Sequence, residues 1–190
     1  MRRPFDFLPS ALAQRLCSVL GLLLLGGLAL VLGEFMRSHS DALINPTAPF
    51  GILSLQFACS ADAARTILDA WDSGALQHAR LSLYWDMAFA PAYGFALAAL
   101  TQRVFAYLAK RGRSSFAVVA WLPLWAMLAD GLENLLHLAL LSADGGQVWL
   151  APAACSTALL KWSLLAGWLL ALGGLVLARK RVKPASLSGR

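Results

Sequence analysis

Four apolar segments, each long enough to cross a membrane, make up most of this 190-residue chain. They cover about residues 16–36, 81–108, 116–141 and 149–178. A helix rises about 1.5 Å per residue, so roughly 20 apolar residues span the hydrocarbon core. None of the segments alternates apolar and polar residues as membrane β-strands do. We therefore predict an all-α integral membrane protein in which residues 1–190 form a single four-transmembrane-helix bundle.

Composition supports this fold class. Only 14% of the residues are charged and 59% are hydrophobic, whereas a soluble domain has roughly 25% charged residues. The apolar run near the N-terminus resembles a signal peptide but is long and lacks a clean small-residue cleavage site, so we interpret it as a retained first helix.

The longest connection, residues 37–80, is predicted to contain a short amphipathic helix at about residues 61–72. Ser60 is a good N-cap, and Asp62 would lie in the first turn, where the helix dipole favours an acid. Its apolar stripe consists of Ala64, Ile67, Leu68 and Trp71. We expect this helix to stop near Gly74 and to pack on the bundle as a lid rather than lie in the membrane interface. For residues 51–58 we expect an interfacial or strand-like piece.

The basic residues are distributed unevenly about the four segments. Twelve of the 16 Lys and Arg residues fall before the first segment, at or near the connection between the second and third, or after the fourth. Under the positive-inside rule this bias places both termini in the cytoplasm and residues 37–80 in the periplasm of a bacterial inner membrane. The net charge of +6 is thus a topology signal and does not indicate nucleic-acid binding. Cys59 and Cys155 both fall on the outer side, where they either form a disulfide or pack as small apolar side chains.

A stripe of polar residues interrupts the third segment. Asp130, Glu133, Asn134 and His137 occur at positions i, i+3, i+4 and i+7, which is one face of a helix. A charged side chain costs at least ~2.5 kcal/mol near the centre of a membrane helix. We therefore expect the stripe to face protein, water or a ligand.

Residues of the second and fourth segments are expected at matching depths. Helical rise places Asp86 ~8 Å and Tyr93 ~18 Å below the outer surface, and Lys161 also ~18 Å deep. Asp130 would lie ~17 Å deep. These depths predict an acidic pocket that opens outward, and an ion pair between Lys161 and a carboxylate of the third segment.

Several chemical roles remain open for this set of residues. The charges could compensate one another in a purely structural network. Metal binding would use oxygen and nitrogen ligands suited to zinc, iron or manganese; its candidates are Asp86, Asp130, Glu133 and His137. A third role is binding of an amphiphile with a cationic or hydroxylated head, and a fourth is acid–base catalysis by Asp86, Asp130 and Glu133.

Four stretches of the chain form a distinctive set of motifs: Gln56–Ala58, Ala64–Trp71, Asp86–Tyr93 with the pattern D-x4-P-x-Y, and Ala129–Asn134 with the pattern A-D-x2-E-N. In these motifs the chain resembles an uncharacterised family of bacterial four-helix inner-membrane proteins. The resemblance extends over about residues 50–165. It implies a four-helix membrane fold and supplies no activity, cofactor or catalytic residue.

The leading functional hypothesis is a polytopic inner-membrane protein that binds a lipid or small amphiphile. The ligand-binding candidates are Asp86, Tyr93, Asp130, Glu133, Asn134, His137 and Lys161. One alternative is an intramembrane acid–base or metal-dependent enzyme. A second alternative is a non-catalytic partner subunit of another membrane protein, including an immunity-type protein. Membrane lipid is the expected partner in every case.

Overall fold

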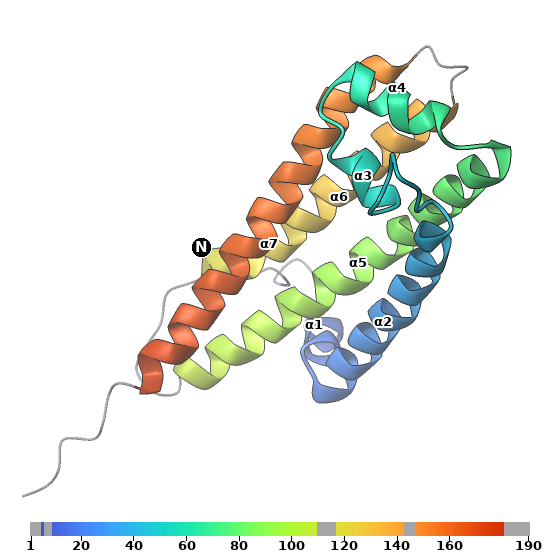
Figure 1. Ribbon diagram of the computed structural model, residues 1–190. Helices are drawn as coiled ribbons and strands as arrows, with labels where there is room; N and C mark the ends of the chain where they lie inside the picture. Colours follow the sequence, from blue (N-terminus) through green and yellow to red (C-terminus); the bar gives the residue numbers. More distant parts are fainter. Residues whose placement is uncertain (1–4, 6–8, 110–116, 143–146, 181–190) are drawn as a thin grey trace, which may run out of the picture.

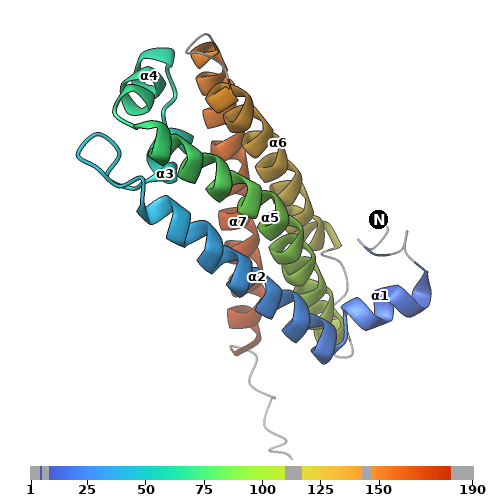
Figure 2. The ribbon, with the colours of Figure 1, turned by 90° about the vertical axis from the view of Figure 1, so that its right-hand side faces the viewer.

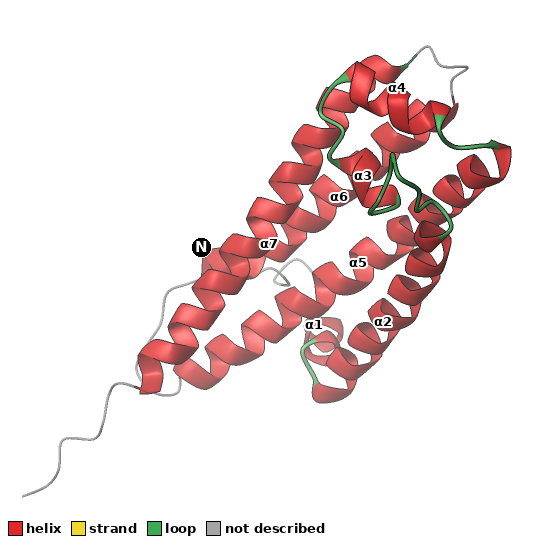
Figure 3. Cartoon of the chain, in the orientation of Figure 1, coloured by secondary structure: helices red, strands yellow, loops and turns green. Residues whose placement is uncertain are grey.

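The regular secondary structure in the described residues is entirely helical. The computed structural model describes residues 5, 9–109, 117–142 and 147–180. Two 3-10 turns, Ala117–Trp121 and Val148–Leu150, precede α6 and α7. The helices are α1 Ser10–Leu16, α2 Val19–Asp41, α3 Ile52–Gln56, α4 Ala61–Asp69, α5 Ser73–Ala109, α6 Leu122–Ser142 and α7 Ala151–Lys180 (Figures 1 and 3).

Three helical stretches are long and apolar enough to cross a membrane, which makes this an all-helical membrane protein. They are Val19–Asp41, Val118–Ser142 and Val148–Leu175. The fourth long helix, α5, has 37 residues and is not among them. Its first half carries His78, Arg80 and Asp86, which lower its apolar character.

The long helices pack side by side in chain order. α2 packs along α5, α5 packs along α6, and α6 packs along α7 (Figures 1 and 2). On α5, Gly94 lies so close to α6 that an added Cβ would be 2.8 Å from Cβ of Met127. This glycine therefore permits the close approach of α5 to α6. Pro91 lies inside α5 without ending it.

The segment between α2 and α5, residues 42–72, forms a cap over one end of the long helices, and α1 lies at the other end (Figure 1). Trp71 is 5% exposed, and its indole Nε1 donates a hydrogen bond to the Leu43 carbonyl at 3.1 Å. Leu55 and Ile67 pack in the same apolar cluster as Leu83 of α5, together with residues of α6 and α7. The apolar stripe of α4 thus packs on the bundle, as the lid prediction requires.

A disulfide between Cys59 and Cys155 joins the cap to α7. Their Cα atoms lie 5.1 Å apart, within the normal range for a bridged pair. Of the two alternatives left open for these cysteines, the structure has the disulfide. Cys17 is a free cysteine at the opposite end of the molecule.

Three predictions about the cap region were wrong or imprecise. Residues 52–56 are a short helix, so the strand-like alternative is wrong. α4 ends at Asp69, and Gly74 is not a helix stop but lies in the first turn of α5. The reason is Asp72, whose Oδ1 accepts a hydrogen bond from the Ala75 amide at 2.7 Å and thereby caps α5. As a result α5 begins eight residues before the predicted start at residue 81.

Much of the charge pattern lies outside the described residues. These positions are Arg2, Arg3, Lys110, Arg111, Arg113, Asp144, Arg181, Lys183 and Arg190. Arg15 and Arg103 are described at the α1 end, where Arg103 donates a hydrogen bond to the Cys17 carbonyl at 2.7 Å. At the cap end, Arg80 donates to the Leu141 carbonyl at 2.7 Å.

The disulfide predicts which cysteine thiols react with a labelling reagent. In denatured but unreduced protein, N-ethylmaleimide should add only to Cys17, and after reduction it should add to all three cysteines, as read from intact mass. Three adducts without reduction would contradict the bridge.

Cys155→Ser should lower the unfolding free energy by up to ~4–5 kcal/mol, because the bridge closes a loop of roughly 100 residues. Cys17→Ser is the control and should leave the unfolding free energy nearly unchanged.

Candidate functional site

The polar stripe of α6 faces the protein and the opposite face of the helix is exposed. Asp130 is 2% exposed and His137 is 1% exposed, while Glu133 and Asn134 are fully buried. On the other side, Leu128, Leu132 and Leu135 are each at least half exposed. This is the reverse of a soluble amphipathic helix, and it is the arrangement expected when lipid is the solvent.

Lys161 of α7 lies between two carboxylates of α6. Its Nζ is 2.8 Å from Asp130 Oδ1 and 2.7 Å from Glu133 Oε2. Lys161 is 5% exposed, so the pair is protected from water. The predicted ion pair is confirmed, and it involves both acids of the stripe rather than one.

Tyr93 connects α5 to the same carboxylate. Its hydroxyl donates a hydrogen bond to Asp130 Oδ2 at 3.0 Å, so Asp130 accepts from α5 on one oxygen and from α7 on the other. Further along α7, toward the α1 end of the molecule, the indole of Trp168 donates a hydrogen bond to the hydroxyl of Thr101 on α5 at 2.8 Å. Thr101 is fully buried and lies on the α1 side of the buried polar residues around Asp130.

Asp86 and Asn134 lie beside these residues and form no close ion pair or well-aligned hydrogen bond of their own. We call the whole group the acidic cluster: Asp86, Tyr93, Asp130, Glu133, Asn134, His137 and Lys161. Asp86 is 5% exposed and interacts with Asn134 and with the charges of Asp130 and Lys161. Neither Asn134 Nδ2 nor Asn134 Oδ1 makes a hydrogen bond of normal geometry with the described residues. The Asn134 amide is thus held only by a poorly aligned contact with Asp86. An unsatisfied buried polar group costs about 1–3 kcal/mol, so Asn134 is a candidate for binding a ligand atom.

His137 lies beneath the cap. Its Nδ1 is 3.0 Å from the backbone carbonyl of Glu133, which only accepts, so Nδ1 carries the proton. The same ring interacts with the backbone of Leu55 in α3. His137 thus joins the polar cluster to the cap.

The cluster contains more carboxyl groups than cations. Asp86, Asp130 and Glu133 supply three carboxyl groups, and Lys161 supplies the single ammonium among the described residues around them. Even with a charged His137 the acids would remain in excess. An unpaired charge is costly in a low-dielectric interior. Protons or a bound cation are therefore needed to balance the remaining carboxylates.

The structure brings together all seven predicted ligand-binding residues: Asp86, Tyr93, Asp130, Glu133, Asn134, His137 and Lys161. It buries them, and the predicted outward-opening pocket is not seen at their position. Within the described residues, no three His, Cys, Asp or Glu side chains are arranged to hold a metal ion. The metal candidates Asp86, Asp130, Glu133 and His137 therefore do not form a metal site in this conformation.

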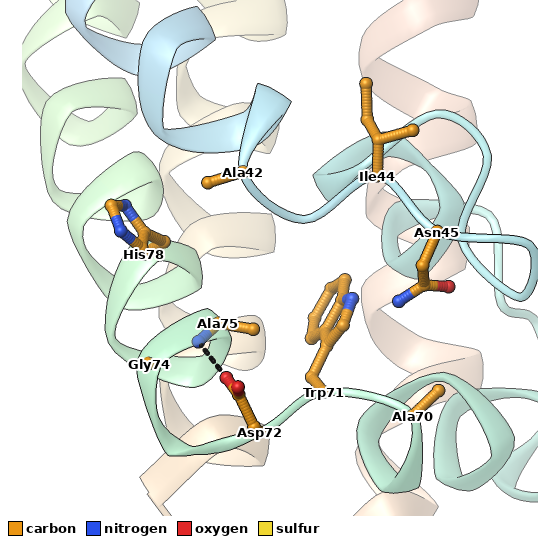
Figure 4. Close-up of a pocket in the computed structure, with 9 residues that line it drawn as sticks. All are labelled: Ala42, Ile44, Asn45, Ala70, Trp71, Asp72, Gly74, Ala75 and His78. Atoms are coloured by element: carbon orange, nitrogen blue, oxygen red, sulfur yellow. Dashed lines mark hydrogen bonds between the residues drawn. The ribbon is translucent and has the colours of Figure 1, made fainter.

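An open pocket of about 420 Å³ lies instead between the cap and the first turns of α5 (Figure 4). Trp71 and Asn45 line it from the cap, and His78 lines it from α5. Asn45 is not free to bind a ligand through its side-chain oxygen, which accepts from the Thr47 and Ala48 amides.

Sequence reasoning missed three polar residues at the cap end of the molecule. Gln56 of α3 is 3% exposed and its Oε1 has no hydrogen-bond partner among the described residues. His39 of α2 and His78 of α5 face each other with their Nδ1 atoms 3.0 Å apart. Neither histidine belongs to a helical stripe, so no local pattern could have indicated the pair.

Comparison of the chain with protein-family models, curated proteins and solved structures finds no match.

The ion pair predicts a specific mutational pattern. Lys161→Met should lower the unfolding free energy by about 3–5 kcal/mol, because two buried carboxylates lose their cation. Adding Asp130→Asn should restore part of this loss, and adding Glu133→Gln as well should restore more. Thermal unfolding in detergent measures the series.

The matched control is Arg37→Met, which removes exposed ion pairs with Glu34 and Asp41. It should cost no more than about 1 kcal/mol. Additive effects of Lys161→Met and Asp130→Asn would contradict the pairing, because side chains in direct contact are expected to couple.

Proposed function

We propose that α5 is a fourth membrane span, that the protein resides in a bacterial inner membrane, and that both termini are cytoplasmic. The length of α5 and its packing between α2 and α6 support a fourth span. The Cys59–Cys155 bridge supports the orientation, because disulfides persist in oxidising compartments such as the periplasm. The cap would then be periplasmic, in agreement with the distribution of basic residues.

Reporter fusions test this topology. Fusions at Gly112 and after Arg190 should be active with a cytoplasmic reporter, and a fusion at Asp41 should be active with a periplasmic reporter. A periplasmic signal at Gly112 would contradict the four-span arrangement.

We further propose that the protein binds a lipid or small amphiphile with a cationic head in the cluster around Asp86 and Asn134. The observation that carries this proposal is the excess of carboxyl groups over cations in a buried site. An ammonium head would balance an unpaired carboxylate, and the unsatisfied Asn134 amide offers a hydrogen-bond acceptor beside it. The apolar chain of an amphiphile would extend into lipid.

The contacts between the helices indicate how an amphiphile would reach the cluster. At the level of the cluster, Tyr93 of α5 and Lys161 of α7 are linked through Asp130 of α6. The direct hydrogen bond from Trp168 to Thr101 lies seven residues further along α7, or about 10 Å lower. The cap is fixed to α7 by the disulfide. We therefore infer that an amphiphile enters sideways, by separation of α5 and α7 above Trp168.

A pair of single-chain probes tests the proposal. Dodecylamine should raise the melting temperature of the protein in detergent, and dodecanoate should not, since only the amine compensates a carboxylate. Asp86→Asn should weaken dodecylamine binding by at least about tenfold, or ~1.4 kcal/mol. Native mass spectrometry should show one bound amine.

The matched control is Asp69→Asn, which changes an exposed acid of α4 in the same way. It should bind dodecylamine like the unmodified protein. Equal binding by Asp86→Asn and Asp69→Asn, or equal stabilisation by dodecanoate, would refute a carboxylate site for a cationic head.

A further inference from the structure

Two histidines meet at the cap end of the bundle, away from the acidic cluster. His39 lies in the last turn of α2, and His78 lies in the second turn of α5. They are separated by 39 residues in the chain. Their proximity therefore results from the packing of α2 against α5 and not from neighbouring sequence positions.

The geometry of the pair suits two ligands on one metal ion. The two Nδ1 atoms are 3.0 Å apart, and the ring centroids are 5.2 Å apart. Two metal–nitrogen bonds of ~2.0–2.1 Å place their nitrogen atoms ~2.9 Å apart at a right angle and ~3.4 Å apart at a tetrahedral angle. The observed separation lies within this range, and a rotation of each ring would turn its Nδ1 lone pair from the other nitrogen onto a shared ion.

Tautomer chemistry allows the same pair to exist with and without metal. Without metal, one ring donates its Nδ1–H to the other, because two lone pairs at this distance would repel. With metal, the donor ring moves its proton to Nε2, and both Nδ1 atoms become ligands. Both rings are partly exposed, so an ion and its water ligands can reach them.

Two acids in the same region already have partners. Asp41 follows His39 by two residues and pairs with Arg37 at 3.1 Å. Asp72 lines the open pocket with His78 and accepts a hydrogen bond from the Ala75 amide (Figure 4). The protein therefore supplies two nitrogen ligands, and water or a small ligand in the adjacent pocket fills the remaining positions.

We propose that His39 and His78 form a two-histidine site for a divalent transition-metal ion such as Zn²⁺ or Cu²⁺, which joins α2 to α5 at the rim of the open pocket. Imidazole nitrogen favours these ions over Mg²⁺, which prefers oxygen ligands. Because the site bridges two helices, metal binding would also restrain the end of α2 from which the cap begins.

Isothermal titration calorimetry of the full chain in detergent, purified without a histidine tag, tests this site. Zn²⁺ should bind with one ion per chain, and Mg²⁺ should give no heat. His39→Gln and His78→Gln should each weaken Zn²⁺ binding at least tenfold. The double variant should bind Zn²⁺ no more weakly than either single variant, because chelation already requires both rings. With Cu²⁺, electron paramagnetic resonance should show hyperfine coupling to two imidazole nitrogens.

Ser38→Ala is the control, since Ser38 neighbours His39 and its hydroxyl bonds to the Phe35 carbonyl of its own helix. It should bind Zn²⁺ like the unmodified chain. Metal-free melting temperatures establish that each variant is folded. Absence of Zn²⁺ binding, or unchanged affinity in either histidine variant, would refute the site and leave an interhelical hydrogen bond.

Discussion

Lys161 of α7 contacts Asp130 and Glu133 of α6, and this contact constrains how the long helices pack. A lone ammonium or carboxylate in hydrocarbon is too costly to persist, so each of these groups must find the other. Lys161 lies on α7 and both acids lie on α6, at 2.8 Å and 2.7 Å. The pairing therefore fixes both the rotation and the relative height of these two helices.

The same interaction determines what faces the membrane. With Asp130 and Glu133 turned inward, Leu128 and Leu132 of α6 are turned outward and are about half exposed. Tyr93 then extends the network to α5 through its bond to Asp130. The position of α2 follows in turn, because α2 packs along α5 through contacts such as the stacked rings of Phe35 and Trp85, 4.8 Å apart.

The sequence predicted those features that rest on local pattern or on the cost of burying charge. The i, i+3, i+4, i+7 spacing indicated the inward face of α6, and matching depths indicated the Lys161–Asp130 pair. Features that depend on packing were not predictable in this way. Gly74 looked like a helix stop, but Asp72 caps α5 immediately before it. Matching depths could not show that neighbouring helices and the cap enclose Asp86 and Asn134, so an open pocket was expected where the structure has a closed cluster.

The cap and the cluster are mechanically linked, which bears on how a closed site could admit a ligand. The disulfide attaches the cap to α7, and the His137 ring of α6 interacts with the Leu55 backbone of the cap. Lifting the cap would disturb both contacts at once. Separating α5 from α7 would leave both in place, and it would exchange the bond between Tyr93 and Asp130 for bonds to a ligand head. Lateral opening thus preserves the attachment of the cap, and it leads to lipid, where an amphiphile is already concentrated.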